Sequence, residues 1–87
     1  MILEGHIISG DFDQANNEFS LQRVKNLSTE SVLNQAQINN IYSYLKQNQN
    51  DSSGQILTLY DQMPVHLSQD EINQLILDLE QVQSMYE

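Results

Sequence analysis

Cysteine is absent from this 87-residue chain. Without it the chain has no disulfide framework and no thiolate metal site, which fits an intracellular protein. No apolar run approaches the roughly 18–20 residues that cross a bilayer. The apolar N-terminus carries Glu4 and lacks the basic segment of a signal peptide. We therefore expect a cytoplasmic protein without a membrane segment.

Basic residues are nearly as scarce. Arg23, Lys25 and Lys46 stand against twelve acidic residues, for a net charge of −9, and residues 51–87 hold seven acids and no base. Lysine and arginine are needed to displace counterions from a phosphate backbone, so direct nucleic-acid binding is not expected. Anionic membranes are disfavoured for the same reason. A basic protein surface would be attracted, although such a charge also serves solubility alone.

Motifs that carry catalysis or bind cofactors are missing too. Gly5, Gly10 and Gly54 are isolated, so there is no glycine-rich phosphate loop. His6 and His66 are the only histidines, and their spacing supplies no set of three or four metal ligands. The paired acids lack the ligand pattern of a calcium loop, and no serine lies in a nucleophile elbow. We expect no enzyme activity, no metal and no cofactor.

The length of the chain predicts one small domain over residues 1–87. Such a chain buries a modest core, which favours completion by a partner or a second copy. Asparagine and glutamine make up 21 of the 87 residues and are spread through the sequence. They are interpreted as a neutral, solvated coat that also suits polar contacts at interfaces.

The clearest predicted element is a helix over residues 68–86. Ser68 can cap its start, and Glu71 three residues later can complete a capping box. Leu67 and Ile72 are spaced for a hydrophobic staple. Beyond them, apolar residues recur every three or four positions, the spacing of a core-facing helix stripe.

Residues 28–47 are also expected to be helical, but their apolar residues do not form one stripe. Val32 and Tyr44 lie on one side of the helical wheel, whereas Ile41 and Leu45 lie on nearly the opposite side. Either the helix breaks near Gln35, or it is a central helix contacted from two directions. The second interpretation is favoured because the segment contains neither glycine nor proline.

The predicted fold class is therefore all-α, a small bundle of about four short helices with an extended N-terminal arm. In the arm, β-favouring residues would form a strand without a partner in the chain, which a second molecule could supply. The segment 52–63 has helical spacing, with a strand as the alternative. The expected arm and helices occupy residues 1–10, 11–26, 28–47, 52–63 and 68–86.

A partner-binding site is expected near the C-terminal half of the last helix. Acidic residues gather there, although the helix dipole favours cations at that end. Leu77 lies outside the apolar stripe, and tyrosine is common at interfaces because it combines apolar area with a polar tip. The candidate partner-binding residues are Tyr44, Asp70, Leu77, Asp78, Glu80, Tyr86 and Glu87.

These features predict a small acidic regulator or inhibitor that occupies a basic surface of a partner protein. The alternative is a helical assembly subunit or cochaperone that acts as a homo-oligomer. The alternative rests on the two-faced helix at 28–47 and on the unpaired arm at 1–10. A homodimer is one oligomer that this alternative would form.

Overall fold

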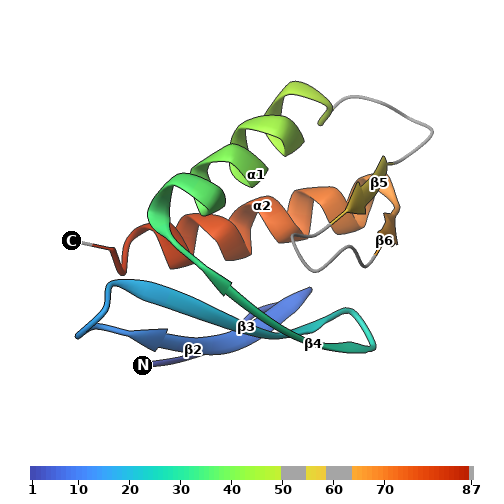
Figure 1. Ribbon diagram of the computed structural model, residues 1–87. Helices are drawn as coiled ribbons and strands as arrows, with labels where there is room; N and C mark the ends of the chain where they lie inside the picture. Colours follow the sequence, from blue (N-terminus) through green and yellow to red (C-terminus); the bar gives the residue numbers. More distant parts are fainter. Residues whose placement is uncertain (50–54, 59–63, 87) are drawn as a thin grey trace.

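The computed structural model describes residues 1–49, 55–58 and 64–86. Two layers are visible in Figure 1: a sheet on one side, and two helices that lie together over one face of it. The elements in chain order are β1 (Ile2–Glu4), β2 (Ile8–Asp13), β3 (Glu18–Val24), β4 (Leu27–Leu33), α1 (Gln35–Gln47), β5 (Gln55–Thr58), β6 (Pro64–Leu67) and α2 (Gln69–Gln83). The fold is mixed α and β, so the all-α prediction is wrong.

The first four strands form an antiparallel meander in the order β1-β2-β3-β4. Along β2 and β3, apolar side chains at alternate positions face the helices, as the period of a strand requires. Phe12 of β2 lies opposite Phe19 of β3, and both are buried. Gly10 is needed beside them, because an added Cβ would collide with the Ser20 carbonyl of β3.

The helix predicted over residues 11–26 is therefore replaced by strands. The apolar residues Phe12, Ala15 and Phe19 have helical spacing, but Ala15 is exposed in a turn. The Asp13 carboxylate accepts hydrogen bonds from the backbone N–H groups of Ala15 and Asn16, at 3.0 and 3.4 Å. Asn17 then takes a left-handed φ of 54°. Local side-chain bonding of this kind favours a turn over a helix.

The helix predicted over residues 28–47 is two elements. Residues 27–33 form β4, and α1 begins at Gln35 behind an Asn34 N-cap whose side chain accepts from the Gln37 N–H. The break does lie near Gln35, but the residues before it form a strand, so the favoured two-faced helix was wrong and the alternative was right only about the position of the break. Val32 belongs to a strand, whereas Ile41 and Leu45 belong to the buried stripe of α1.

The predictions of an N-terminal arm and of a helix at 52–63 are corrected as well. β1 is not a free arm, because Ile2, Leu3 and Glu4 pair with Asp11, Gly10 and Ser9 of β2. In the other segment, residues 55–58 form β5, which pairs with β6 in a separate two-stranded ladder. The strand alternative was therefore correct there, while residues 52–54 and 59–63 lie outside the described part of the chain.

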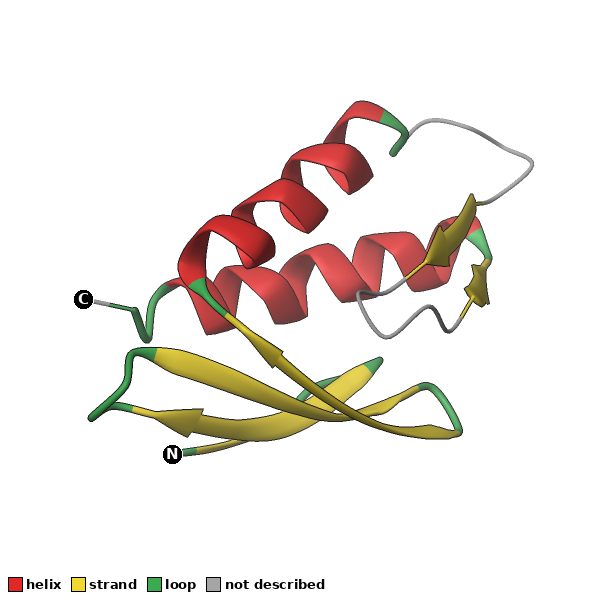
Figure 2. Cartoon of the chain, in the orientation of Figure 1, coloured by secondary structure: helices red, strands yellow, loops and turns green. Residues whose placement is uncertain are grey.

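The last helix begins at Gln69 behind a Ser68 N-cap, where its sequence predicts. It lies beside α1 on the same side of the sheet (Figure 2). The Ser68 hydroxyl accepts from the Glu71 N–H at 3.2 Å, and the Glu71 carboxylate accepts from the Ser68 N–H at 2.9 Å. The predicted capping box is confirmed. The apolar stripe of α2 packs against α1 and the sheet, and its buried residues are Ile72, Leu75, Ile76, Leu79 and Val82.

The end of the chain closes the core from the side of β4. The Tyr86 hydroxyl donates to the Leu33 carbonyl at 2.6 Å. Its ring meets that of Phe12 edge to face, with centroids 4.8 Å apart. Burial raises the pKa of Tyr86 to about 12, because an ionised phenol would lose its hydration there. The Tyr86 side chain therefore serves the core.

A buried carboxylate joins the two layers. Asp78 of α2 is only 1% exposed. It accepts hydrogen bonds from the backbone N–H groups of His6, Ile7 and Ile8, at 3.0, 2.7 and 3.2 Å. These groups belong to the turn between β1 and β2 and to the start of β2. Gly5 makes room for the contact, since a Cβ at this position would overlap the Asp78 carboxylate.

Replacing Asp78 should destabilise the protein severely. In Asp78→Ala three N–H groups, two of them buried, lose their acceptor, which we expect to lower the free energy of unfolding by about 3–5 kcal/mol. Asp78→Asn keeps one acceptor oxygen and should lose about 1–3 kcal/mol. Urea unfolding measures both. Asp70→Asn, at an exposed position of the same helix, is the control and should change stability by about 0.5 kcal/mol or less. Equal effects at the two positions would contradict the anchoring role of Asp78.

Candidate protein-binding surface

The face of the sheet opposite the helices carries more acidic than basic side chains. One row across the strands, set by the pairing register, contains Ile2, Asp11, Ser20 and Val32. A second row contains Glu4, Ser9, Arg23 and Ser28. We call this surface the outer sheet face. Its acidic residues are Glu4, Asp11, Asp13, Glu18 and Glu30, and Arg23 is the basic side chain among them.

Two of these acids are occupied within the molecule. Asp11 lies 3.2 Å from the N-terminal amine of Met1. Asp13 holds the turn that follows β2, and hydrogen bonds from the side chain and backbone of Asn16 lower the pKa of its carboxyl. Their charges are thus partly satisfied by local contacts, which reduces what they could offer to a partner.

The other three acids are not neutralised. Among the residues that the structure describes, the carboxylates of Glu4, Glu18 and Glu30 make no hydrogen bond and no ion pair. Asp13 and Glu18 also lie directly opposite each other in the ladder. Like charges in that arrangement are destabilising. The outer sheet face therefore carries repulsion that a basic partner would relieve.

The β4 edge borders this face. β4 is the last strand of the sheet, so in the described part of the chain its outer side pairs with no other strand. A register shift leaves Thr29 and Glu30 opposite the single residue Gln22 of β3. Extra residues of this kind are common at sheet edges and beside functional sites.

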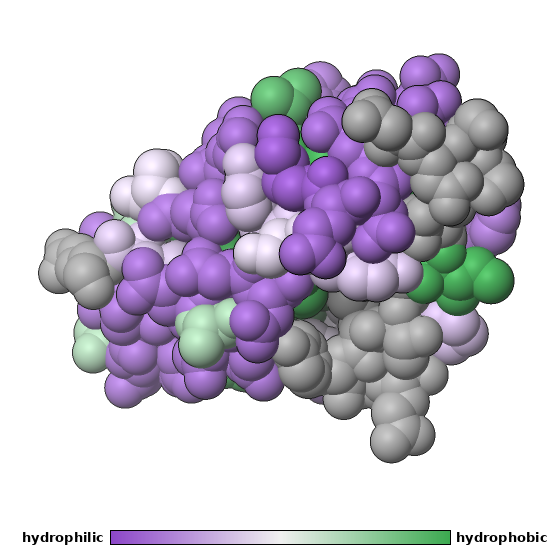
Figure 3. Space-filling view, turned by 90° about the horizontal axis from the view of Figure 1, so that it is seen from above, coloured by the Kyte–Doolittle hydropathy of each residue, from purple (hydrophilic) through white to green (hydrophobic). Residues whose placement is uncertain are grey.

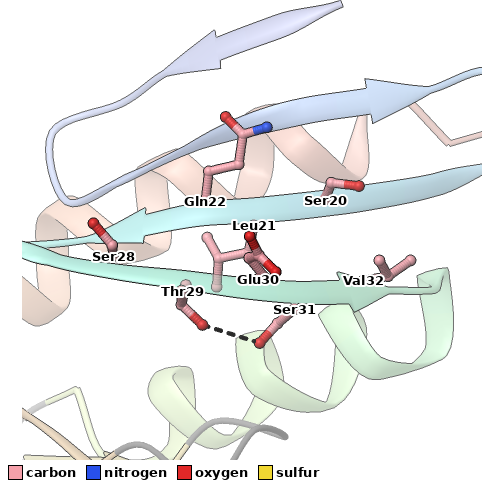
Figure 4. A pocket seen from close by; sticks show the side chains of 8 residues that line it. All are labelled: Ser20, Leu21, Gln22, Ser28, Thr29, Glu30, Ser31 and Val32. Atoms are coloured by element: carbon pink, nitrogen blue, oxygen red, sulfur yellow. Dashed lines mark hydrogen bonds between the residues drawn. The ribbon is translucent and has the colours of Figure 1, made fainter.

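An open groove of about 920 Å³ runs along β4 (Figure 4). Thr29 and Ser31 point toward the side of α1, and their hydroxyls are 3.3 Å apart. Glu30 and Val32 alternate with them and are exposed, Val32 to 56%. The residues that line the groove are Ser20, Leu21, Gln22, Ser28, Thr29, Glu30, Ser31 and Val32.

The start of β4 is held in place by Lys25 in the preceding turn, where this residue takes a left-handed φ of 57°. Its ammonium group lies 2.9 Å from the Glu71 carboxylate and donates to the His66 carbonyl at 3.0 Å. The pKa of Glu71 is lowered, chiefly by the hydrogen bond from the Ser68 backbone N–H and then by that from Lys25. One lysine thus ties the β3–β4 turn to β6 and α2.

The helix face is closed by polar contacts between the helices. Tyr42 of α1 donates to Glu80 of α2 at 2.7 Å, and this hydrogen bond raises the pKa of Tyr42. Two further hydrogen bonds run from the Gln83 side chain to that of Asn39 at 3.0 Å and from the Gln49 side chain to that of Asn73 at 3.1 Å. The view onto this side is predominantly hydrophilic (Figure 3). Several of the abundant amides therefore join the two helices.

The partner-binding residues expected from the sequence do not form one surface. Asp78 and Tyr86 are buried, so a surface role for them is wrong. Leu77 is 54% exposed and Tyr44 is also exposed, but Tyr44 lies on the other helix. Asp70 and Glu80 are exposed on α2, where Glu80 accepts from Tyr42. Glu87 lies outside the described residues.

The acids of the outer sheet face were missed by the sequence analysis, as was the β4 edge. Their signal was the alternation of polar and apolar residues, which places Glu30 and Val32 on one side of β4 and Ser31 and Leu33 on the other. The sequence instead predicted a helix over residues 28–47, so the alternation within residues 30–33 was not used.

The described residues contain no group of three or more acidic or histidine side chains arranged to hold a metal ion. A void of about 20 Å³ lies between sheet and helices, and its lining is entirely apolar. Within residues 1–49, 55–58 and 64–86, neither helix has the length and apolar character needed to cross a membrane.

Comparison of the chain with protein-family models, with curated protein sequences and with solved structures returns no match.

The contribution of Glu71 to stability should depend on pH. Its folded-state pKa lies below the ordinary value of 4.5, so its charge stabilises the fold above that pH and ceases to do so as pH falls through the lowered pKa. Glu71→Gln keeps a capping side chain but removes the charge. At pH 7 the variant should be less stable by about 0.5–1 kcal/mol.

Urea unfolding of both proteins between pH 7 and pH 3 tests this. The difference in stability should shrink once the pH falls below 4.5, the ordinary pKa. A difference that stays constant over the whole range would show that the Glu71 charge plays no part.

Proposed function

We propose that this protein is a small acidic binding module, a regulator or inhibitor that occupies a basic surface of a partner protein. The carrying observation is the set of three carboxylates on the outer sheet face, Glu4, Glu18 and Glu30, which have no ion pair in the described part of the chain. Unneutralised acids on one face attract a basic surface and speed its association at low salt.

The arrangement of the basic residues supports this proposal. Lys25 is used internally by Glu71, and the N-terminal amine is used by Asp11. Arg23 therefore stands alone on the outer sheet face, among the described residues, against the three unpaired acids. These acids do not stabilise a helix, because they lie on strands.

The assembly-subunit alternative has lost its two supports. The two-faced helix is a strand followed by a helix, and the unpaired arm is the first strand of the sheet. No observation on the described residues favours a homo-oligomer in their place.

A charge-removal experiment tests the proposed function. The tagged protein is used to capture binding proteins from cell extract at low salt, and the captured proteins are then purified and titrated against it. Glu4→Gln/Glu18→Gln should weaken binding by about tenfold at low salt, and the difference should shrink at high salt. Fluorescence anisotropy measures both.

The matched control removes two charges from the helix face, in Asp70→Asn/Glu80→Gln, and should leave the affinity within about twofold. Equal weakening by the two double variants would show that only net charge matters. Affinity that does not change with salt would contradict charge-led recognition altogether.

A further inference from the structure

The β4 edge carries a further inference that rests on the proposed function and names the form of the partner. β4 extends over seven residues, Leu27–Leu33. In an antiparallel ladder, alternate residues direct their N–H and C=O groups away from the neighbouring strand. At the edge of a sheet these groups are a template for another strand. Among the described residues no strand occupies that side of β4.

We propose that β4 binds an extended segment of a partner protein as a fifth strand of the sheet. Main-chain hydrogen bonds supply affinity in this mode of recognition, and alternate side chains supply specificity. The groove described above is lined by β3 as well as by β4, so it lies over the sheet beside this edge and not beyond it (Figure 4).

The side chains of β4 define the chemistry of the incoming segment. On the outer sheet face, the exposed Glu30 carboxylate favours lysine or arginine opposite it. Val32, two residues further and 56% exposed, favours an apolar side chain. On the other side of the strand, Thr29 and Ser31 are buried, only 8% and 6% exposed, and their hydroxyls lie 3.3 Å apart. The segment therefore has a basic and an apolar residue two positions apart, with small polar residues between them.

A second copy of this chain is the less suitable occupant. Antiparallel pairing of two β4 strands about their central residue would place Glu30 of one copy opposite Glu30 of the other. Like charges opposite each other are destabilising, and each molecule carries a net charge of −9. Glu30 therefore protects the edge against self-pairing while it attracts a basic strand.

The test uses a labelled seven-residue peptide that is blocked at both ends. Every second position holds lysine or valine in turn, and threonine fills the positions between them. A peptide of the same composition with the lysines and valines grouped together is the control. Binding is followed by fluorescence anisotropy, and hydrogen exchange is followed by NMR at the backbone amides of residues 27–33. The alternating peptide should slow exchange of the outward amides by about tenfold or more, and the grouped peptide should not.

Charge reversal provides the matched variants. Glu30→Lys should lower the affinity for the lysine peptide by about fivefold. The same variant should bind more tightly to a peptide with glutamate in place of lysine. Glu80→Lys makes the same change of net charge on the helix face and should leave both affinities within about twofold. Far-UV circular dichroism confirms that both variants are folded.

Three results would overturn the strand proposal. The first is unchanged exchange at residues 27–33 when the peptide is bound. The second is equal weakening by Glu30→Lys and Glu80→Lys, which shows attraction by charge alone and leaves the proposed function intact. The third is a dimer in light scattering whose β4 amides are protected without peptide. A different result would separate the two proposals. If the peptide binds as a strand but Glu4→Gln/Glu18→Gln has no effect on partner capture, the proposed role of the outer sheet face is refuted and the proposed role of the β4 edge stands.

Discussion

The fold depends on one buried carboxylate. Isolated charges are costly inside proteins, because water no longer solvates them. Asp78 is stabilised there because three backbone N–H groups of the first turn and of β2 converge on it. The contact fixes the turn against the middle of α2, and so it sets how the helix lies over the sheet. Ile7 and Ile8, which supply two of the donors, are thereby carried into the core.

This arrangement leaves the two faces of the molecule in different electrostatic states. On the helix side, tyrosine, glutamate and amide side chains satisfy one another across α1 and α2. On the sheet side, three carboxylates remain without such partners in the described residues. The acidic groups that a basic partner could neutralise are therefore on the strands, beside an edge that pairs with no other strand in the described part of the chain.

Sequence reasoning succeeded where several local signals agreed. Ser68 and Glu71 cap the last helix as expected, and this helix needs little help from tertiary structure to be recognised. It failed where short strands carry spacings that also suit a helix. Phe12 and Phe19 are seven residues apart, which matches two helical turns, yet they face each other across a hairpin. Asp13, Asn16 and Asn17 between them are turn-forming residues, and giving them more weight would have favoured the hairpin.

The candidate site was harder to predict, because it depends on pairing between distant strands. Asp78 looks like a surface acid in sequence, since only the fold reveals three donors contributed by residues 6–8. Glu30 can be recognised as a candidate binding residue only once β4 is known to be an edge strand. No local pattern identifies an edge strand, because that property belongs to the whole sheet.

The position of Asp78 also has a consequence for how the chain matures. Its bond to Ile7 spans 71 residues, and the bond from Tyr86 to Leu33 spans 53. Contacts between such distant residues slow folding, since a long loop must close before they form. During synthesis the four strands leave the ribosome well before α2. The apolar face of the sheet is therefore exposed until α2 can pack against it. An apolar sheet face left exposed in this way is prone to aggregation until α2 covers it.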